Sequence, residues 1–343
     1  MRVGILTGGG DCPGLNAVIH AVVTVGRRRH GHEHVGLRRG WKGLLDRDTL
    51  PLGPEDVAGI ATRGGTILGS SRTNPFKSEG GGAEAAAAVA ELELDALVAI
   101  GGEDTLGVAQ RLHAEHGVAT VGVPKTIDND LSATDYTFGF WTAVQVATDA
   151  IDRVKTTAES HDRIIVVEVM GRHAGWLALE SGVAGNADAI LIPEVPVTFD
   201  RIEGWVQARR ERGRLFSVIV VSEGVELEAE AQDDGDRDEF GHAQLAKVGV
   251  GERLAEHLEA HLGAEARAVV LGHVQRGGTP VAFDRALATR YGTRAAELVQ
   301  ERGYGRMAAL RGDRVTDVPL ADAVAELKIV PQELYRAAET FFG

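Results

Sequence analysis

The sequence predicts an α/β protein in which helices cover both faces of a doubly wound, mainly parallel sheet. Three observations support this fold class: short continuous apolar runs recur along the chain, stretches of helical composition alternate with them, and 44 glycines stand against 10 prolines. Continuous apolar runs are typical of strands that are buried on both faces. Glycine suits the tight turns that join such strands to helices.

The apolar runs, each rich in β-branched residues or leucine, are predicted as strands. They cover residues 3–7, 96–100, 120–123, 164–169, 189–192, 217–221 and 268–272. Most of them end in glycine with polar residues. Ligands of doubly wound sheets gather at the carboxyl ends of the strands, so these ends are the first candidates for a functional site.

The segments between the strands have the composition of helices. We expect helices over residues 83–93, 141–159 and 251–262. The tail from residue 322 to residue 342 is predicted as one or two amphipathic helices around Pro331, with a packing role.

Length and charge narrow the class of protein. A chain of 343 residues is longer than one compact core usually organises, so two domains or one large α/β domain are expected. The net charge of -14 would repel phosphates of nucleic acids and anionic lipids, so neither is expected as a partner. The apolar run at the N-terminus is too short for a signal peptide or a membrane span, and the single cysteine makes no internal disulfide, so we expect a cytoplasmic protein.

The first glycine turn, GGGDCPG at residues 8–14, follows the predicted strand 3–7. It is a weak nucleotide signal, because Pro13 stands where the dinucleotide-binding fingerprint needs its third glycine. A helix should begin directly after the turn, which favours anion binding over a plain tight turn. No sequence feature supplies Cys12 with a base, so we predict a small turn residue and not a nucleophile.

The segment PKTIDND, residues 124–130, places Asp128 and Asp130 two residues apart after a predicted strand, with Lys125 just upstream. Either acid alone is most simply explained as a helix cap or turn residue. The combination of Lys, Thr and two Asp favours a base that activates a hydroxyl, because such a carboxylate needs cations nearby to stay ionised.

Basic side chains stand at the ends of two further predicted strands. Arg163 and Arg172 bracket the strand 164–169, and His273 and Arg276 follow the strand 268–272. The planar guanidinium group suits phosphate oxygens, while a surface ion pair is the ordinary alternative for any one of these arginines.

Three polar segments also have competing interpretations. The acidic residues 226–242 lack apolar periodicity and are predicted as a solvated loop or flap; a calcium site is the weaker alternative, because the acids do not follow the EF-hand spacing. The histidines of HGHEH, residues 30–34, are predicted to be solvated, since no second ligand group stands at a matching spacing. Arg27, Arg28 and Arg29 either line an effector site or form a solvated basic face.

Several segments taken together closely resemble the phosphofructokinase family, in the family's order, from residue 1 to about residue 300. They are GGGDCPGLNAVI, GGEDT, PKTIDND, VEVMGRHAGWLAL and LGHVQRGGTPVAFDR. The resemblance implies two Rossmann-like domains with the active site in the cleft between them. It places a larger, donor-binding domain at residues 1–140 and about 256–305, and a smaller, sugar-phosphate-binding domain at residues 141–255 and about 306–343.

The resemblance also implies transfer of a phosphoryl group to the 1-hydroxyl of fructose 6-phosphate, with Mg²⁺ as cofactor. Gly10 resembles the backbone contact to the donor phosphate, and Glu103 resembles the acid that accompanies Mg²⁺. Asp128 corresponds to the base that takes the proton of the sugar hydroxyl. Arg72, in SSRTN, resembles the arginine that neutralises the phosphoryl group in flight.

The remaining implied contacts belong to the sugar phosphate. Those to the sugar and the transferring group come from the loop around the base and from two further strand ends: Thr126, Asp130, Met170, Gly171, Arg172 and Glu223. Those to the 6-phosphate come from Arg163, Arg267, His273 and Arg276. In the family the first two of these arginines belong to the neighbouring subunit, which implies a homo-oligomer, a dimer or a tetramer.

Two residues distinguish the phosphoryl donor. Members of the family that use ATP generally have glycine in place of Asp104, and many have glycine in place of Lys125. An aspartate there adds bulk and negative charge against the longer donor, while a lysine supplies positive charge to a shorter one. The pair resembles the pyrophosphate-dependent branch, which implies a reversible step of glycolysis and gluconeogenesis. The alternatives are an ATP-dependent phosphofructokinase and a catalytically silent sugar-phosphate sensor; intact Asp128 and Glu103 argue against the sensor.

Overall fold

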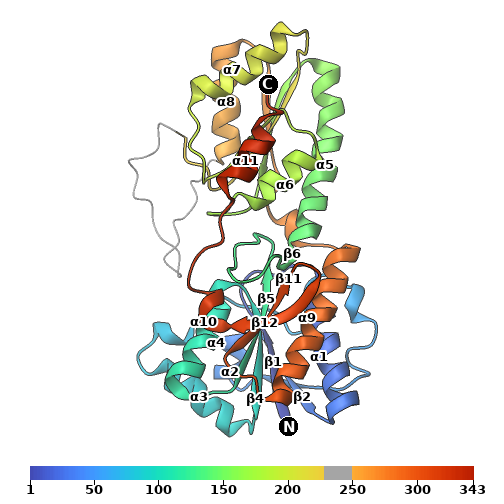
Figure 1. Ribbon diagram of the computed structural model, residues 1–343, viewed down its shortest axis with the longest axis vertical. Helices are drawn as coiled ribbons and strands as arrows, with labels where there is room; N and C mark the ends of the chain where they lie inside the picture. Colours follow the sequence, from blue (N-terminus) through green and yellow to red (C-terminus); the bar gives the residue numbers. More distant parts are fainter. Residues whose placement is uncertain (228–248) are drawn as a thin grey trace. The chain divides into compact units, whose positions relative to one another are not determined.

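The computed structural model describes residues 1–227 and 249–343, and the predicted acidic loop lies outside them from residue 228 to residue 242. Contacts divide the chain into two compact units. Unit 1 comprises Met1–Ile127, Leu131–Thr142 and Arg276–Leu327, and unit 2 comprises Asp128–Asp130, Ala143–Gln275 and Lys328–Gly343. Each unit has a sheet with helices packed on it, so the predicted α/β class is confirmed (Figure 1).

Unit 1 is built on an eight-stranded sheet. In hydrogen-bonding order its strands are β12 (Arg314–Pro319), β11 (Arg306–Arg311), β5 (Thr120–Thr126), β4 (Ala96–Gly101), β1 (Arg2–Thr7), β2 (Glu33–Leu37) and β3 (Thr49–Leu52), and β6 (Phe138–Gly139) pairs with β5. The strands from β11 to β2 run parallel, while β3 and β12 pair antiparallel at the two edges. This arrangement brings the carboxyl ends of β1, β4 and β5 to one edge.

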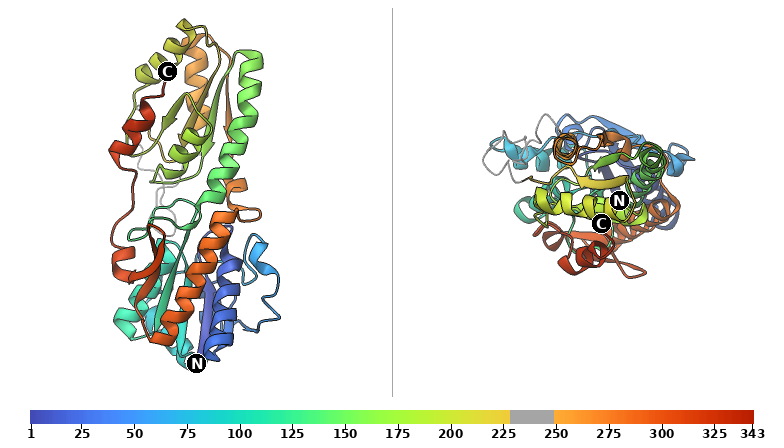
Figure 2. Two further views of the ribbon diagram at one scale, coloured as in Figure 1. Left: turned by 45° about the vertical axis from the view of Figure 1, so that its right-hand side comes forward. Right: turned by 90° about the horizontal axis from the view of Figure 1, so that it is seen from above.

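Helices cover both faces of this sheet. They are α1 (Leu15–His30), α2 (Trp41–Leu45), α3 (Gly81–Glu91), α4 (Glu103–His116), α9 (Ala282–Glu301) and α10 (Leu320–Ala323), with short 3₁₀ helices η1 (Ile60–Thr62) and η2 (Pro75–Lys77). Helices α1 and α9 pack on each other and lie side by side in Figures 1 and 2. Helices α2, α3, α4 and α10 share a hydrophobic core with β1 and β4, in which Leu6, Leu97 and Leu106 are fully buried.

Unit 2 has a four-stranded parallel sheet in the order β10 (Ala266–Val270), β7 (Ile164–Val169), β9 (Ser217–Ser222) and β8 (Ala189–Leu191). Its helices are α5 (Phe140–His161, whose first residues belong to unit 1), α6 (Trp176–Ala184), α7 (Phe199–Glu211), α8 (Val250–Leu262) and α11 (Gln332–Glu339), and η3 (Gly272–Arg276) is a 3₁₀ turn. Helices α7 and α8 share one core with the sheet, in which Ile202, Leu254 and Leu258 are buried. None of the helices in the described residues is long and apolar enough to cross a membrane.

Most predicted elements are present. Strand β7 covers the predicted residues 164–169, and α8 differs from its prediction by one residue. Strand β10 ends two residues before the predicted limit of 272, because η3 begins there. The prediction did not include β2, β3, β11 or β12, which pair at the edges of the larger sheet.

The limits of the two units differ from the expected domain limits, most of all in the second half of the chain. Residues 256–275 lie in unit 2, because α8 and β10 pack on β7, and residues 306–327 lie in unit 1, because β11 pairs with β5 and β12. The predicted roles of the domains, donor binding and sugar-phosphate binding, stay predictions.

Two of the histidines in residues 30–34 are buried, in contrast to the prediction. His32 and His34 are 2% and 5% exposed, so the prediction of solvated side chains is wrong for both. Gly26 of α1 leaves room for the imidazole ring of His34, because a Cβ at Gly26 would collide with Nε2 of that ring. Burial lowers the pKa of His34 to about 4, so this imidazole is neutral in the folded protein near pH 7.

Candidate active site

The carboxyl ends of β1, β4 and β5 form one edge of the sheet in unit 1. Thr7 stands opposite Ile100, and Gly101 stands opposite Pro124. The N–H of Gly8 donates to the carbonyl of Ile100 at 3.0 Å, so the first glycine turn begins against β4. The register therefore brings the turn 8–14, the turn after β4 and Lys125 together.

Glycine is required at this edge because the side chain of Thr105 fills the space beside two strands. A Cβ added at Gly8 or at Gly101 would collide with Thr105, which is 3% exposed. Cys12, farther along the first turn, is fully buried, and its thiol lies 3.6 Å from the carbonyl of Phe138. Burial raises the pKa of this thiol, which disfavours the thiolate that a nucleophile needs.

Two cations lie against Gly10. Lys125 is buried, and its ammonium group donates to the carbonyl of Gly10. A Cβ at Gly10 would lie 2.5 Å from Nη1 of Arg276, so this guanidinium group occupies the other side of the residue. Arg276 was predicted to bind the 6-phosphate together with His273, whereas it lies against Gly10, to which Lys125 also donates. A glycine turn with two cations is suited to a phosphate group.

Glu103 and Asp104 occupy the first turn of α4, which Gly102 precedes as N-cap. Acids at this position are favourable in any helix, because they face the positive end of its dipole. Here they also line a groove of about 330 Å³ with Asn74, Phe76, Gly107, Val108, Gln110, Arg111 and Val324. The groove runs along α4, with the carboxylates of Glu103 and Asp104 at the N-terminus of this helix.

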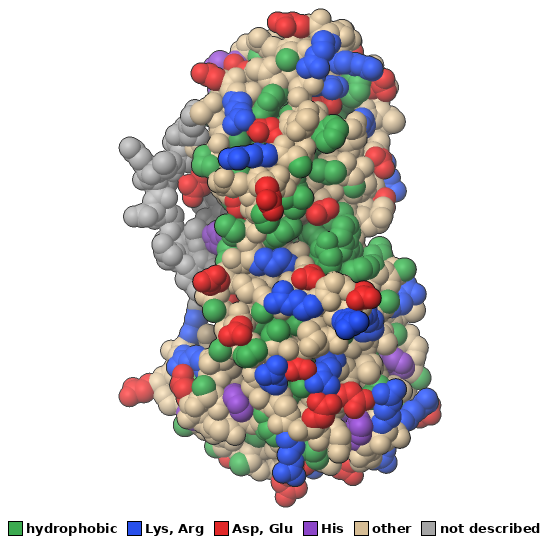
Figure 3. Space-filling view, in the orientation of Figure 1, with side chains coloured by type: hydrophobic (Ala, Val, Ile, Leu, Met, Phe, Trp, Pro, Cys, Tyr) green, Lys and Arg blue, Asp and Glu red, His purple; other side chains and the backbone are tan. Residues whose placement is uncertain are grey.

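Arg72 is exposed and follows a segment that is bonded to the first glycine turn. The N–H of Gly9 donates to the carbonyl of Ser71 at 3.1 Å, and the hydroxyl of Ser70 donates to the carbonyl of Gly9. These bonds hold the backbone next to Arg72 beside the turn. Acidic and basic side chains are interspersed on the face of the molecule shown in Figure 3.

The loop after β5 holds the two acids of PKTIDND in different surroundings. Asp128 is 5% exposed, while Asp130 is half-buried. Asn129 between them has a φ of 53°, a left-handed conformation that asparagine tolerates better than most residues. Lys328 fixes the loop, since its N–H donates to the carbonyl of Asp130 at 2.9 Å and its ammonium group donates to Oδ1 of Asn129 at 3.1 Å. At the other end, the hydroxyl of Thr137 donates to the carbonyl of Thr126 at 2.8 Å.

In unit 2, the neighbouring ends of β7 and β9 bring Met170, Gly171, Arg172 and Glu223 together. The N–H of Glu223 donates to the carbonyl of Val169 at 2.8 Å, and Oε1 of Glu223 accepts from the N–H of Arg172 at 3.2 Å. Gly171 has a φ of 141° and Arg172 a φ of 48°. A left-handed arginine costs free energy, and such strain concentrates at functional loops.

Gln275 is a residue that the sequence analysis missed. It is fully buried, and its side-chain oxygen accepts from the N–H of Met170 at 2.9 Å, so it fixes the loop that holds Arg172. Its side-chain nitrogen is also buried and has no hydrogen-bond partner among the described residues. The only signal in the sequence was its place in LGHVQRGG, between two residues that were selected for their charge.

Arg163 and Arg267 lie at the opposite edge of the same sheet. Arg163 precedes β7, whose six residues span about 20 Å, and Arg172 follows β7. Arg163 pairs with Glu265 at 2.7 Å, and Arg267 pairs with Glu265 and Glu259 at 2.8 Å each. The hydrogen bond from Arg163 lowers the pKa of Glu265. His273 is exposed in η3, beyond the carboxyl end of β10. Within unit 2 the two arginines therefore do not share a site with His273.

Glycine turns, buried cations and carboxylates at the carboxyl ends of parallel strands are typical of α/β enzymes that bind phosphate groups. The comparison with protein families is more specific, because the phosphofructokinase family matches residues 2–299. The chain belongs to the phosphofructokinase family.

Curated relatives match along their whole length. A protein of Amycolatopsis methanolica named pyrophosphate–fructose 6-phosphate 1-phosphotransferase is 59% identical, with 100% of both chains covered. A protein of Streptomyces coelicolor named ATP-dependent 6-phosphofructokinase 3 is 53% identical, with 99% of both chains covered. Relatives named for either donor are thus similar to this chain.

Solved structures confirm the predicted phosphofructokinase fold. A pyrophosphate-dependent phosphofructokinase from Nitrosospira multiformis matches with a TM-score of 0.84 at 21% identity, over 96% of this chain and 86% of that one. The Pichia pastoris phosphofructokinase matches with a TM-score of 0.81 at 30% identity over 99% of this chain. This chain spans 36% of the length of the Pichia chain.

Proposed function

We propose that this protein transfers a phosphoryl group from pyrophosphate to the 1-hydroxyl of fructose 6-phosphate, giving fructose 1,6-bisphosphate and phosphate in a reversible reaction. The observation that carries the choice of donor is the buried ammonium group of Lys125 at the carbonyl of Gly10, close to a helix that begins with Glu103 and Asp104. The Amycolatopsis relative is named for this reaction.

Lys125 and Arg276 favour a short, highly charged donor at the Gly10 turn. A buried cation loses hydration on folding and interacts strongly with an anion brought beside it. The groove along α4 is lined by the acids Glu103 and Asp104. We infer that an ATP molecule would have to pass its α-phosphate along these acids. The cations at the Gly10 turn would attract pyrophosphate, and the acids of the groove would repel ATP. Attraction of one ligand combined with repulsion of another is how a protein selects between similar ligands.

Mg²⁺ is the cofactor that we propose for the donor, and Glu103 is the residue that would hold it. The fit is chemical: Mg²⁺ prefers carboxylate oxygens and keeps several waters, and Glu103 is an exposed carboxylate that opens on a groove of about 330 Å³. When bound, the ion would neutralise charge on the donor phosphates.

In unit 2, the sugar phosphate would meet Glu223 and the loop of Met170, Gly171 and Arg172. A carboxylate accepts several hydrogen bonds, so Glu223 can accept from sugar hydroxyls while it holds the N–H of Arg172. Gln275 keeps the loop in place through the N–H of Met170. We assign to Arg172 and Arg72 the neutralisation of the group in transfer.

Asp128 would act as the general base. Its buried carboxylate takes the proton of the 1-hydroxyl as the oxygen attacks the phosphorus of the donor, and the bond to the leaving phosphate breaks. Thr126 and Asp130 flank it, and the bonds of Lys328 to the backbone of Asp130 and to Asn129 hold the loop. Preorganisation of this kind is what positions a base within reach of its proton.

Arg163, Arg267 and His273 would bind the 6-phosphate, and the two arginines would come from a second copy of the chain. Their place at the far edge of the sheet from Arg172 supports this assignment, because about 20 Å of β7 separates the two ends. Mixing inactive Asp128→Asn and Arg163→Ala proteins, followed by reassembly, should therefore restore part of the activity. Mixed oligomers without any recovery would rule out a shared site.

The function is tested with the purified protein, fructose 6-phosphate and Mg²⁺, with pyrophosphate in one reaction and ATP in another. We expect turnover with pyrophosphate, slow or no turnover with ATP, and production of pyrophosphate in the reverse reaction. An Asp128→Asn sample prepared in parallel measures contaminating activity. Faster turnover with ATP would overturn the choice of donor, and no turnover with either donor would favour the sensor.

A further inference from the structure

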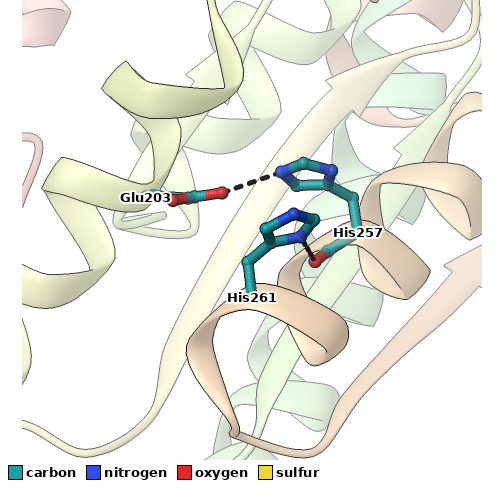
Figure 4. A group of neighbouring side chains, drawn as sticks. All are labelled: Glu203, His257 and His261. Atoms are coloured by element: carbon teal, nitrogen blue, oxygen red, sulfur yellow. Dashed lines mark hydrogen bonds and ion pairs between the residues drawn. The ribbon is translucent and has the colours of Figure 1, made fainter.

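A group of two histidines and one glutamate lies in unit 2, on residues to which the proposed reaction gives no role. His257 and His261 belong to α8, and Glu203 belongs to α7 (Figure 4). One potential ligand atom from each of the three side chains can be chosen so that all three atoms lie within 4.8 Å of one another. Both helices pack on the same sheet through a common hydrophobic core, so the backbone positions of the three residues are fixed by the fold.

The spacing of the histidines places both rings on one side of α8. Residues four apart in a helix are neighbours on its surface. The two imidazole rings are stacked, with centroids 4.0 Å apart and planes inclined by 21°. Glu203 reaches them from the other helix, since its Oε1 lies 2.8 Å from Nε2 of His257.

Neighbouring groups orient the two rings. Nδ1 of His261 lies 2.8 Å from the carbonyl of His257; that nitrogen must carry the proton to donate, and Nε2 of a neutral ring then has its lone pair available. The ring of Phe199 stacks on that of His257 at 3.7 Å. Hydrogen bonds and packing of this kind are what hold histidine ligands in metal sites.

We propose that Glu203, His257 and His261 form a binding site for Zn²⁺ or a similar borderline transition-metal ion. Two imidazoles and one carboxylate match the ligand preference of Zn²⁺, whereas Mg²⁺ and Ca²⁺ prefer oxygen ligands. Ligands about 2.0 to 2.2 Å from a tetrahedral Zn²⁺ stand about 3.3 Å apart, so small side-chain rotations would close the site. Water would take the fourth position.

The ion would connect α7 to α8 and replace the hydrogen bond between Glu203 and His257. The side chains of His257 and Glu203 are 21% and 22% exposed, and His261 is exposed, so an ion can reach the site from solvent. Binding to the folded protein stabilises it in proportion to the free ion. The inference is independent of the proposed reaction, because none of the three residues serves the donor or the sugar.

The test is a titration of the full-length protein with ZnCl₂ after treatment with a chelator and removal of the chelator. We expect one Zn²⁺ per chain by calorimetry, and a rise in Tm with Zn²⁺. His257→Ala and His261→Ala should each weaken binding by at least about tenfold, as expected when a metal ligand is lost. Glu203→Gln should weaken it less, because the amide oxygen remains a weaker ligand.

His161→Ala is the matched control, because His161 is also exposed on a helix of unit 2 and stands outside the group. It should bind Zn²⁺ as the original protein does. Circular dichroism confirms that each variant is folded. Co²⁺ supplies a second measurement, since the bound ion absorbs visible light according to its ligands, and each histidine substitution should change the spectrum.

An equal affinity in the original protein and in both histidine variants would overturn the proposal, as would a Co²⁺ spectrum that neither substitution alters. Binding of Zn²⁺ that His161→Ala weakens as much as His257→Ala would show general attraction to surface histidines and would also overturn it. Turnover with Mg²⁺ is expected to be unchanged in His257→Ala.

Discussion

The two units differ in the side chains that lie at the carboxyl ends of their parallel strands. In unit 1 the first glycine turn meets cations, with Lys125 bonded to the carbonyl of Gly10 and Arg276 against the same residue. In unit 2 the turn after β7 meets hydrogen-bond acceptors, because Glu223 accepts from the N–H of Arg172 and Gln275 accepts from the N–H of Met170.

In the proposed function, this difference lets the two sheets serve different ligands. Cations beside glycine backbone suit a compact polyanion such as pyrophosphate. Carboxylate and amide groups beside a strained loop suit the hydroxyls of a sugar, with Arg172 available for its charged part. In this proposal, the backbone architecture sets where each ligand would bind, and the side chains at the strand ends decide which ligand it would be.

The largest effect is expected from Asp128, whose proposed role lies in the chemical step and not in binding at either edge. Asp128→Asn should lower kcat by about two to four orders of magnitude with little change in KM, the usual contribution of a positioned base. Steady-state kinetics measure it, and Asp152→Asn on the exposed side of α5 is the control. Near-normal turnover in a folded variant would remove Asp128 from this role.

Lys125 and Glu223 test the comparison directly. Lys125→Ala should reduce kcat/KM for pyrophosphate by about a hundredfold, because a buried charge-assisted contact is worth about 2 to 3 kcal/mol. Glu223→Gln should instead raise KM for fructose 6-phosphate. Lys42→Ala, an exposed change in the same unit, should alter neither value. If both variants raised the same KM, the two edges would not bind separate ligands.

Asp104 tests the choice of donor within unit 1, where Lys125 is proposed to attract pyrophosphate and Asp104 to repel ATP. Asp104→Gly should shift the ratio of kcat/KM for ATP and pyrophosphate toward ATP by about ten- to a hundredfold, which corresponds to the loss of about 1 to 3 kcal/mol of repulsion. Activity with pyrophosphate should fall only moderately, since Glu103 is retained. An unchanged ratio would mean that Asp104 does not select the donor, and the proposed preference for pyrophosphate would then rest on Lys125 alone.

The smallest effect concerns folding and belongs to unit 1 alone. Burial lowers the pKa of His34 to about 4 from an ordinary 6.5, so the unfolded chain binds this proton more readily and stability is lost as pH falls from about 6.5 to about 4. At pH 5 the loss is about 2 kcal/mol. Denaturant unfolding at pH 7 and pH 5 should show a smaller pH dependence in His34→Gln than in the exposed control His116→Gln. Equal slopes in the two variants would contradict the assignment.

Local patterns predicted the parts of the fold that depend on local composition. Strand β7, IIVVEV, is apolar except for Glu168 because neighbouring strands and helices bury both its faces, and its limits were predicted correctly. Strands β11 and β12 were missed because their outer residues are charged or exposed and because their pairing with each other across Gly312, and of β11 with β5, depends on the folded sheet. Edge strands have a weaker apolar signal for this reason.

Family motifs selected the residues of the candidate site, but the sequence did not predict their arrangement. The family motifs pointed to Gly10, Lys125 and Arg276, but the contact of Arg276 with the Gly10 turn joins residues more than 260 positions apart in the chain. The burial of His34 likewise depends on the absence of a side chain at Gly26 in another element. Long-range packing of this kind leaves no periodic pattern in a single sequence.

The side chain of Thr105 has a consequence for how this family can vary. Because it excludes a Cβ at Gly8 and also at Gly101, the three positions constrain one another across two strands and a helix. A larger residue at Gly8 needs a smaller side chain at position 105, and one at Gly101 needs glycine there, because its Cβ would lie 2.3 Å from the Cβ of Thr105, so the order of substitutions matters. In an alignment of homologues these three columns should therefore change together or remain as they are, and a path that begins at either glycine should be closed.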